Sequence, residues 1–379
     1  MDHFNYKNGA LHAEDVPLSR IAAEVGTPVY VYSRATLERH ARVFQEAVKP
    51  AGRTDVAFAV KANPNLAVLR VLSNAGMGAD VVSGGELERA LAAGMAPHRI
   101  VFSGVGKTAT EMAQGLDRAI GQFNIESEEE GIEFSAIADA RGDKANCVLR
   151  VNPDVDAGTH AKISTGKAEN KFGVAIGDAP AIYARLAALP GLNMRGVALH
   201  IGSALPTIDP LEEAFIRMGR LVNDLRNGGQ QVTHVDLGGG LGVAYRPSDV
   251  MPTPEDYGAM VARISKNWDV TLMFEPGRLL VGNAGVLLTE VLVLKPGLTA
   301  DGGKNFCIVD AAMNDLLRPA LYEAYMAIEP CVQREGPIER WDVAGPVCES
   351  GDWLGRDREL AVAPGDKLAV LSAGAYGMT

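Results

Sequence analysis

A lysine at the end of an apolar run is the first residue whose chemistry stands out. Lys61 lies in the segment Phe-Ala-Val-Lys-Ala-Asn, at the end of a strand expected to be buried on both faces. Because an unpaired ammonium is costly to bury, its side chain must reach solvent or a partner. Taken alone, the segment favours a solvated lysine. The alternative is an amine that condenses with an aldehyde cofactor as a Schiff base.

A glycine cluster could hold an anion. In Asp236-Leu-Gly-Gly-Gly-Leu-Gly242, Gly238, Gly239 and Gly240 allow backbone amides to turn toward a phosphate. By itself the cluster is equally compatible with a tight turn. It lacks the GxGxxG spacing of dinucleotide sites, so a lone phosphate fits better than NAD or FAD.

A carboxylate and a guanidinium follow another apolar run, in Glu275-Pro-Gly-Arg278. They could be only an ion pair. In a pyridoxal phosphate site, however, a carboxylate that faces the ring nitrogen keeps it protonated and strengthens the electron sink. His200 could then stack on the cofactor, although a histidine on an apolar strand is more often a core residue.

Two further clusters lie toward the carboxyl end. Arg318-Pro-Ala-Leu-Tyr322 offers a forked donor and a phenol, which suit a carboxylate ligand. Cys348-Glu-Ser-Gly-Asp352 places a thiol beside a carboxylate. The cysteine could be a buried hydrophobe or, in an active site, a general acid.

Composition limits the class of protein. The 379 residues carry a net charge of −11, and no stretch supplies the basic surface that nucleic acid or an anionic membrane requires. No apolar run reaches the roughly 18 residues of a membrane span, and the amino terminus lacks a signal core. The four cysteines form no CxxC pair, so neither disulfides nor a metal site are indicated. We expect a cytoplasmic protein that acts on a small molecule.

The elements that must position these residues repeat as strand and helix. This alternation predicts an α/β protein, a (β/α)8 TIM barrel over residues 34–280, with its chemistry just after the strands. The expected strands are Val56–Val60, Ala79–Val82, Ile100–Phe102, Phe123–Ile125, Cys147–Val151, Gly196–Ile201, His234–Leu237 and Leu272–Phe274. The expected helices include Leu66–Ala75, Glu86–Ala93, Glu111–Ile120, Ala179–Ala188 and Leu211–Arg226.

A second, mostly β domain with a Greek-key or sandwich-like character is expected from residues 281–379 together with 1–33. Beyond Leu280 the strand-like runs have no helices between them. The helix Thr36–Ala47 separates the amino-terminal segment from the barrel, so that segment is expected to pair with the β domain. The runs are Val286–Val293, Phe306–Val309, Trp341–Val347 and Lys367–Leu371.

Together these motifs resemble the diaminopimelate decarboxylases, which are fold-type III pyridoxal phosphate enzymes related to alanine racemase and eukaryotic ornithine decarboxylase. The superfamily motifs span residues 30–33, 59–63, 78–87, 150–155, 200–203, 236–242 and 275–278. Segments 163–173, 313–322 and 348–352 resemble the diaminopimelate enzymes in particular.

The resemblance implies a pyridoxal 5'-phosphate cofactor and a set of roles. Lys61 would form the internal aldimine, His200 would stack on the ring and Glu275 would face its nitrogen. Cys348, contributed across a homodimer interface, would protonate the carbanion. The other implied cofactor ligands are Asp80, Ser203, Gly238, Gly239, Gly240, Gly277, Arg278 and Tyr376; the implied substrate ligands are Arg278, Arg318, Tyr322, Glu349 and Tyr376.

The implied reaction is decarboxylation of meso-2,6-diaminopimelate at its D-centre to L-lysine and carbon dioxide, the last step of lysine biosynthesis. Two alternatives stay open: another basic amino-acid or carboxyspermidine-type decarboxylase, and a pyridoxal phosphate carrier without activity. Carriers on this fold are bare barrels, so Arg318, Cys348 and the β region argue against the carrier. The loop from Ile163 to Phe172 is expected to act as a mobile lid.

The sequence departs from the family pattern at two places. Ala204 stands where the family usually has glutamine, which removes a polar group near the expected phosphate site. Family members also continue for a few dozen residues beyond the position of Thr379, and we expect that segment to complete the β domain. A chain without it would leave a strand edge open.

Overall fold

The computed structural model describes residues 2–156, 171–297 and 303–377. The chain divides into two units, each described here by itself. One contains His40–Gly242 and Val250–Leu279, and the other contains Met1–Arg39, Val243–Asp249 and Leu280–Thr379. We call them the barrel unit and the β unit. Most of the segment expected to form a lid falls outside the described residues.

Within the described residues of the barrel unit, eight parallel strands form a closed barrel. Sheet order runs β9-β11-β12-β13-β5-β6-β7-β8, and β8 pairs back to β9, which closes the circle. The predicted barrel is thus confirmed. Its strands are β5 (Thr54–Ala59), β6 (Gly78–Val81), β7 (Ile100–Phe102), β8 (Gln122–Ile125), β9 (Ala145–Asn152), β11 (Leu192–Ala198), β12 (His234–Asp236) and β13 (Thr271–Phe274). A short strand, β10 (Val174–Ala175), adds to β9.

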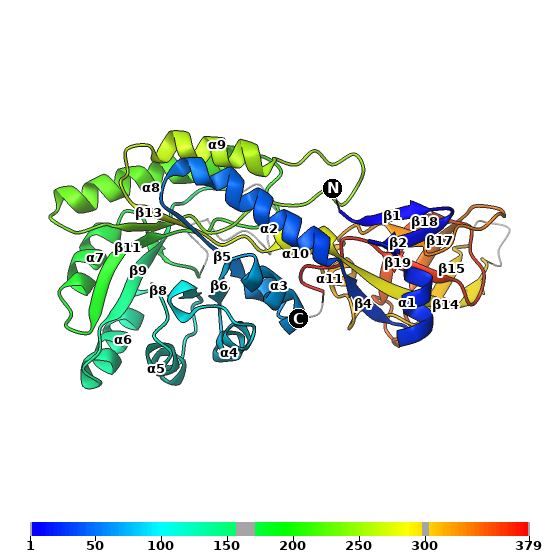
Figure 1. The fold of residues 1–379 in the computed structure, drawn as a ribbon, viewed down its shortest axis with the longest axis horizontal. Helices are drawn as coiled ribbons and strands as arrows, with labels where there is room; N and C mark the ends of the chain where they lie inside the picture. The colour runs from blue at the N-terminus through cyan, green and yellow to red at the C-terminus, as the bar shows by residue number, and fades with distance from the viewer. Residues whose placement is uncertain (1, 157–170, 298–302, 378–379) are drawn as a thin grey trace. The chain divides into compact units, whose positions relative to one another are not determined.

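Helices cover the outside of the barrel. Figure 1 shows α4, α5 and α6 along one side and α8 and α9 along the opposite side. Aromatic rings fill part of the layer between strands and helices: Phe44 and Tyr257 each meet Phe274 edge to face, with centroids 6.0 and 6.1 Å apart. The helices are α2 (Arg34–Val48), α3 (Leu66–Asn74), α4 (Gly84–Ala92), α5 (Ala109–Asp117), α6 (Glu128–Ala140), α7 (Ala179–Ala187), α8 (Asp209–Asn227), α9 (Pro254–Ser265) and α10 (Arg278–Val281).

Side-chain caps fix where several of these helices begin, and so how long the loops above the strands are. Ser83, Thr108 and Ser127 each accept a hydrogen bond from the backbone N–H three residues later. At Thr108, Glu111 returns a bond to the cap residue, which makes a capping box. These caps hold the loops that follow β6, β7 and β8 short and defined.

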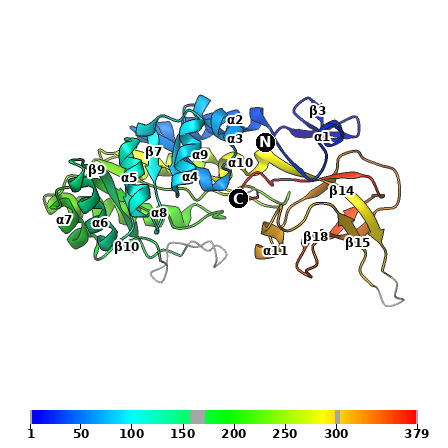
Figure 2. The ribbon, with the colours of Figure 1, turned by 90° about the horizontal axis from the view of Figure 1, so that it is seen from below.

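The β unit is organised around one long strand, β14 (Gly285–Lys295), as Figure 2 shows. It pairs antiparallel with β4 (Val29–Tyr32), β15 (Phe306–Val309) and β19 (Lys367–Val370). Through the pairing of β4 with β14, residues Val29–Tyr32 of the amino-terminal segment form part of this sheet. The remaining elements are β1 (Phe4–Lys7), β2 (Ala10–Ala13), β3 (Val16–Pro17), α1 (Leu18–Val25), α11 (Arg318–Tyr322), β16 (Ile328–Pro330), β17 (Glu339–Ala344) and β18 (Trp353–Leu360).

Two elements of the β unit differ from the sequence expectation. A one-turn helix, α11, forms where only strands were expected, with Pro319 in its first turn, where proline suits a helix. Strand β18 was not predicted, because its sequence Trp-Leu-Gly-Arg-Asp-Arg-Glu-Leu is too charged to show a strand pattern. Pairing with β17 supplies the order that the sequence alone does not show.

Among the described residues, no helix is both long enough and apolar enough to cross a membrane.

Candidate active site at the carboxyl ends of the barrel strands

Lys61 and Asp80 form an ion pair at the centre of the barrel. Lys61 lies in the single turn Val60–Ala62 that ends β5, and Asp80 lies on the neighbouring β6. The Lys61 Nζ is 3.1 Å from Asp80 Oδ2, and the Asp80 side chain is fully buried. Within the described residues, Asp80 Oδ1 has no hydrogen-bond partner. A buried carboxylate oxygen without a donor points to a ligand that brings one.

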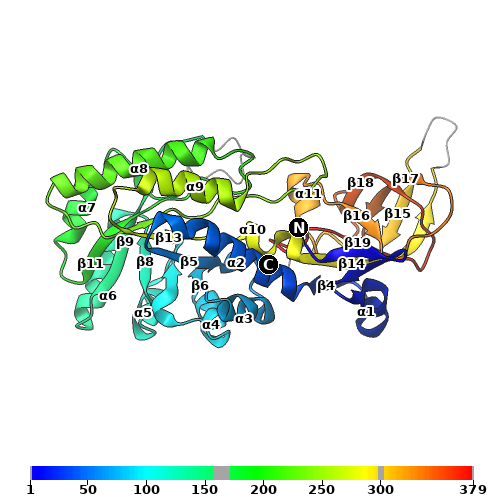
Figure 3. The same cartoon turned by 45° about the horizontal axis from the view of Figure 1, so that its top comes forward.

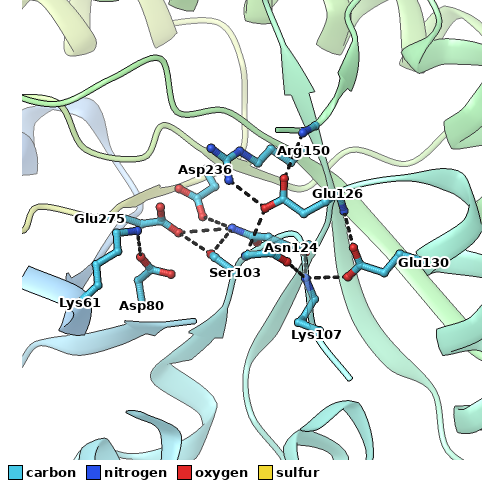
Figure 4. A network of polar contacts seen from close by, with 12 residues as sticks. Lys61, Asp80, Ser103, Lys107, Asn124, Glu126, Glu130, Arg150, Asp236 and Glu275 are labelled. Atoms are coloured by element: carbon cyan, nitrogen blue, oxygen red, sulfur yellow. Dashed lines mark hydrogen bonds and ion pairs between the residues drawn. The ribbon is translucent and has the colours of Figure 1, made fainter. Parts of the chain in front are cut away.

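Glu275 and Asp236 lie next to each other and close to this pair, at the ends of β13 and β12 (Figure 4). Asn124 Nδ2 donates to both, at 3.3 Å from Glu275 Oε1 and 3.3 Å from Asp236 Oδ2. Ser103 Oγ adds a contact of 3.4 Å to Glu275. The two carboxyl groups are therefore fixed by neutral side chains rather than by cations.

Burial raises the pKa of Glu275 well above its usual range, and the charges of Asp236 and Asp80 raise it further. Burial also raises the pKa of Asp236, but its hydrogen bond with Glu275 lowers it. Of the two carboxyl groups, Glu275 has the pKa that is raised more strongly. A carboxyl in this state is poised to exchange its proton with a basic atom placed next to it.

His200 is held as a neutral ring. It follows β11, and its Nδ1 accepts the Gly239 backbone N–H at 3.2 Å, which leaves the proton on Nε2. Burial lowers the pKa of His200 well below its usual value, and the charges of Lys61 and Arg150 lower it further. A flat, uncharged imidazole is suited to stack on an aromatic ligand.

The glycine loop leaves no room for side chains. A Cβ on Gly239 would lie 2.5 Å from the Glu275 backbone oxygen, and one on Gly238 would lie 2.5 Å from the Leu199 oxygen. Gly238 also has a φ of +63°, a conformation that favours glycine. The backbone of this loop can therefore approach a ligand closely.

Arg278 supplies the charge beside the glycine loop. It is buried, and its Nε donates to Ser203 Oγ at 3.3 Å. Gly277 precedes it, directly after Pro276, whose carbonyl accepts the Ala59 N–H at 3.1 Å and so ties the end of β13 to β5. The donor set fits a phosphate. Ala204, near this loop, has a φ of +60°, and the effect of its missing polar group stays a prediction.

The other predicted residues lie in the β unit. Arg318 and Tyr322 are neighbours on α11, with the Arg318 Cζ 5.3 Å from the centroid of the Tyr322 ring. Cys348 and Glu349 lie on an exposed turn between β17 and β18. Tyr376 is half-buried near the end of the described residues. The structure thus brings together the barrel set and, separately, the pair on α11.

Sequence reasoning missed the polar residues that support the barrel set. Gln122 and Asn124 alternate with apolar residues along β8, so both point to the same side. Gln122 Nε2 donates to Asn124 Oδ1 at 2.9 Å and to Asp236 Oδ2 at 3.3 Å. Two amides at alternate positions of a buried strand were the signal that could have revealed them.

A second buried network continues from Asn124 toward α6 (Figure 4). Lys107 Nζ donates to the Asn124 carbonyl at 2.8 Å and lies 2.6 Å from Glu130 Oε1. Arg150 Nη1 lies 2.8 Å from Glu126 Oε1, and Glu126 Oε2 also accepts the Gly173 N–H at 3.0 Å. These ion pairs fix the ends of β8 and β9.

Fold and site together define a class. A closed (β/α)8 barrel with a lysine after its first strand, and with Glu275, Arg278 and the glycine loop at the strand ends, is compatible with a pyridoxal-dependent decarboxylase barrel. Residues 34–282 match the family model described as "Pyridoxal-dependent decarboxylase, pyridoxal binding domain".

Individual relatives narrow the class. The chain is 52% identical over 378 residues to diaminopimelate decarboxylase from Pseudomonas fluorescens, covering 100% of this chain and 89% of the relative. Among solved structures, diaminopimelate decarboxylase from Helicobacter pylori complexed with L-lysine is similar with a TM-score of 0.90, 39% identity and coverage of 95% and 89%. Diaminopimelate decarboxylase from M. jannaschii in co-complex with L-lysine is similar with a TM-score of 0.94 and 37% identity, covering 100% of this chain and 89% of that chain. The chain belongs to the diaminopimelate decarboxylase family.

Proposed function

We propose that this protein decarboxylates meso-2,6-diaminopimelate at its D-configured carbon and releases L-lysine and carbon dioxide. One observation carries the chemistry: the Lys61–Asp80 pair, with a buried Asp80 oxygen that lacks a donor among the described residues, beside Glu275, whose pKa burial raises. The full-length identity to relatives named diaminopimelate decarboxylase supports the choice of substrate. We infer that the cytoplasmic location expected from the sequence holds for this enzyme.

The residues of the barrel unit fit pyridoxal 5'-phosphate from one end to the other. Arg278, Ser203 and the amides of Gly238, Gly239 and Gly240 would bind the phosphate. Gly277 and Tyr376 are proposed as further cofactor ligands. When bound, pyridoxal phosphate supplies an electron sink for the electron pair that a departing carboxylate leaves behind.

Asp80, His200 and Glu275 are the remaining polar residues of the barrel site, and each would orient, stack on or hold a proton toward the cofactor. Asp80 orients the Lys61 ammonium through a contact of 3.1 Å, and His200 offers the face of a neutral ring. Glu275 would lie toward the ring nitrogen of the bound cofactor, where its carboxyl would hold a proton. An unpaired carboxylate is unstable in such a buried place.

Substrate recognition is proposed for the β unit. Arg318, with Tyr322 beside it, has the forked donor that a carboxylate accepts bidentately, and Glu349 would receive the distal amino group. Arg278 and Tyr376 are proposed as further substrate ligands. A second carboxylate distinguishes diaminopimelate from lysine, so this pair accounts for a preference between them.

Cys348 is the proposed proton donor to the carbon that has lost carbon dioxide. Its thiol lies on an exposed turn together with Glu349. An exposed turn of this kind can be inserted into a neighbouring molecule. We therefore propose a homodimer in which Cys348 and Glu349 complete the site of the other subunit.

The test is turnover by purified protein supplied with pyridoxal phosphate. Carbon dioxide and lysine are measured with meso-diaminopimelate, and ornithine, arginine and lysine are run in parallel. Turnover of diaminopimelate alone is expected. Turnover of another basic amino acid instead would replace this proposal with the decarboxylase of that substrate.

Replacing Lys61 tests whether it is the lysine that binds the cofactor. Lys61→Ala is expected to abolish the visible absorbance of bound cofactor, because the only amine that lies beside Asp80 among the described residues is lost. Lys304→Ala, which removes an exposed lysine of the β unit, is the matched control and should keep the band. Retained absorbance in Lys61→Ala would assign the cofactor to another lysine.

A further inference from the structure

The β unit contains a polar cavity that the proposed reaction does not use. It has a volume of about 500 Å³ and is lined by Arg246, Tyr325, Glu329, Arg356, Asp357 and Arg358, among others. The arginines come from two segments: Arg246 from residues 243–249, and the other two from β18. We call it the arginine cavity.

The three arginines are held by aromatic rings rather than by carboxylates. The guanidinium carbons of Arg246 and Arg358 lie 3.9 and 4.1 Å from the centroid of Tyr325, and that of Arg356 lies 4.1 Å from the Trp353 ring. Stacking occupies the flat face of a guanidinium and leaves the N–H groups at its edge available.

No carboxylate oxygen of the described residues lies within ion-pair distance of these three guanidinium groups. The same unit pairs its other surface arginines in the ordinary way. Arg20, Arg34, Arg334 and Arg340 each contact a carboxylate at 2.7–3.5 Å. The lining also contains three acidic side chains, Glu329, Asp357 and Glu359, but among the described residues none of them forms an ion pair with the three guanidinium groups.

Arg358 has a buried donor without an acceptor among the described residues. It donates to the carbonyls of Arg356 and Met326, at 2.9 and 3.1 Å, but its Nε is buried with no acceptor in the described residues. Burial lowers the pKa of Arg358, and the charge of Arg246 lowers it too. A buried donor without an acceptor, beside a second cation, is stabilised by an incoming anion.

The acidic residues of the lining do not supply that anion. Glu359 accepts from Arg340 at 3.3 Å, and Glu329 lies beside Tyr6, where burial raises the pKa of its carboxyl. Asp357 is exposed, and its backbone N–H donates to Asp342 at 2.9 Å. The forked donors of the arginines thus remain available to a ligand.

We propose that the arginine cavity is a second ligand site, which binds a small oxyanion through the guanidinium edges of Arg246, Arg356 and Arg358. The shared chemistry is a phosphate or carboxylate group, because both accept two parallel N–H donors from one guanidinium. The site takes no part in the decarboxylation proposed above, so the two proposals stand or fall separately.

The test measures binding to the holoenzyme, whose cofactor fills the phosphate site of the barrel. Inorganic phosphate and citrate are titrated by calorimetry at constant ionic strength. One equivalent per chain is expected for at least one of them. Binding of phosphate alone indicates a phosphorylated ligand, binding of citrate alone indicates a polycarboxylate, and binding of both indicates a general oxyanion site.

Variants locate the site. Arg246→Gln with Arg356→Gln should weaken binding at least about tenfold, which corresponds to ~1.4 kcal/mol. The control Arg334→Gln removes a surface arginine of the same unit outside the cavity and should bind as the wild type does. No heat of binding up to about 10 mM, where a Kd near 1 mM would be seen, overturns the proposal. An equal loss of binding in Arg334→Gln would overturn it as well.

A second measurement keeps the test decisive if the double variant does not fold. Crystals of the wild-type holoenzyme are soaked in selenate, whose anomalous scattering marks an oxyanion directly. A peak within hydrogen-bond distance of Arg356 and Arg358 supports the site. Peaks only elsewhere on the molecule refute it, whatever the catalytic activity proves to be.

Discussion

Replacing Asp352 should both destabilise the β unit and slow the reaction, because one buried carboxylate joins two parts of the proposed site. Asp352 is 3% exposed. Its Oδ1 accepts the Met313 N–H at 2.6 Å, and its Oδ2 accepts the Val347 N–H at 2.8 Å. Its own N–H donates to the Glu349 carbonyl at 3.0 Å. The turn that carries Cys348 is therefore tied to the segment that leads into α11.

The magnitude follows from those contacts. A hydrogen bond to a charged group contributes about 1.5–3 kcal/mol, so Asp352→Ala, which removes two such bonds, should cost ~3–6 kcal/mol of unfolding free energy. Asp352→Asn keeps one acceptor oxygen and should cost about half as much. Asp15→Ala removes a carboxylate that is 97% exposed and should cost less than about 1 kcal/mol.

Urea unfolding followed by circular dichroism measures the stability, and lysine formation from meso-diaminopimelate measures kcat. We expect kcat of Asp352→Ala to fall at least about tenfold, which corresponds to ~1.4 kcal/mol of activation free energy. The cofactor absorbance should be kept, because Asp352 does not belong to the barrel unit. An unchanged kcat in a destabilised variant would refute the positioning role. Equal damage from Ala and Asn would refute the hydrogen-bond account.

Three further changes test other parts of the structure. Gly239→Ala should weaken cofactor binding, followed by absorbance, because its Cβ would meet a backbone oxygen at 2.5 Å; Gly177→Ala, with nothing within 4 Å, should not. Lys107→Met should cost ~3–5 kcal/mol in urea unfolding, because it leaves a buried carboxylate unpaired, whereas Lys7→Met, at an ion pair exposed on both sides, should cost less than about 1 kcal/mol. Burial and nearby arginines lower the pKa of His234 to about 4, so the unfolded state binds a proton that the folded state does not. Its contribution to stability is complete above pH 6.5 and is lost as the pH falls toward 4; a His234→Gln variant should show a flatter pH dependence.

The barrel could be predicted from the sequence because its strands are short apolar runs that alternate with amphipathic helices. For the same reason Lys61, His200 and Glu275 could be placed at the carboxyl ends of strands. The β unit was less regular. Strand β18 carries alternating charges, and α11 begins only because Leu317 and Pro319 permit a helical turn there.

What the sequence could not show is which distant residues share a buried place. Asp236 and Glu275 lie 39 positions apart, and only closure of the barrel brings them together with Asn124. The motif Cys348–Asp352 does not show that Asp352 is buried. Its carboxylate accepts hydrogen bonds from backbone N–H groups of two separate segments. Such contacts depend on tertiary packing and leave no mark on local spacing.

The distribution of charge in the barrel gives the strongest physical reason to expect a cofactor there. Asp80, Asp236 and Glu275 are buried together, and among the described residues the one ion pair to any of them joins Lys61 to Asp80 (Figure 4). Figure 3 shows β13, β5 and β6, the neighbouring strands that lead to Glu275 and Lys61 and carry Asp80. Burial raises the pKa of Glu275, and the repulsion from Asp236 and Asp80 raises it further. A protein gains nothing in stability from this arrangement. A ligand with a basic nitrogen toward Glu275 and an anion toward Arg278 would relieve both ends at once, which is the charge pattern of pyridoxal phosphate.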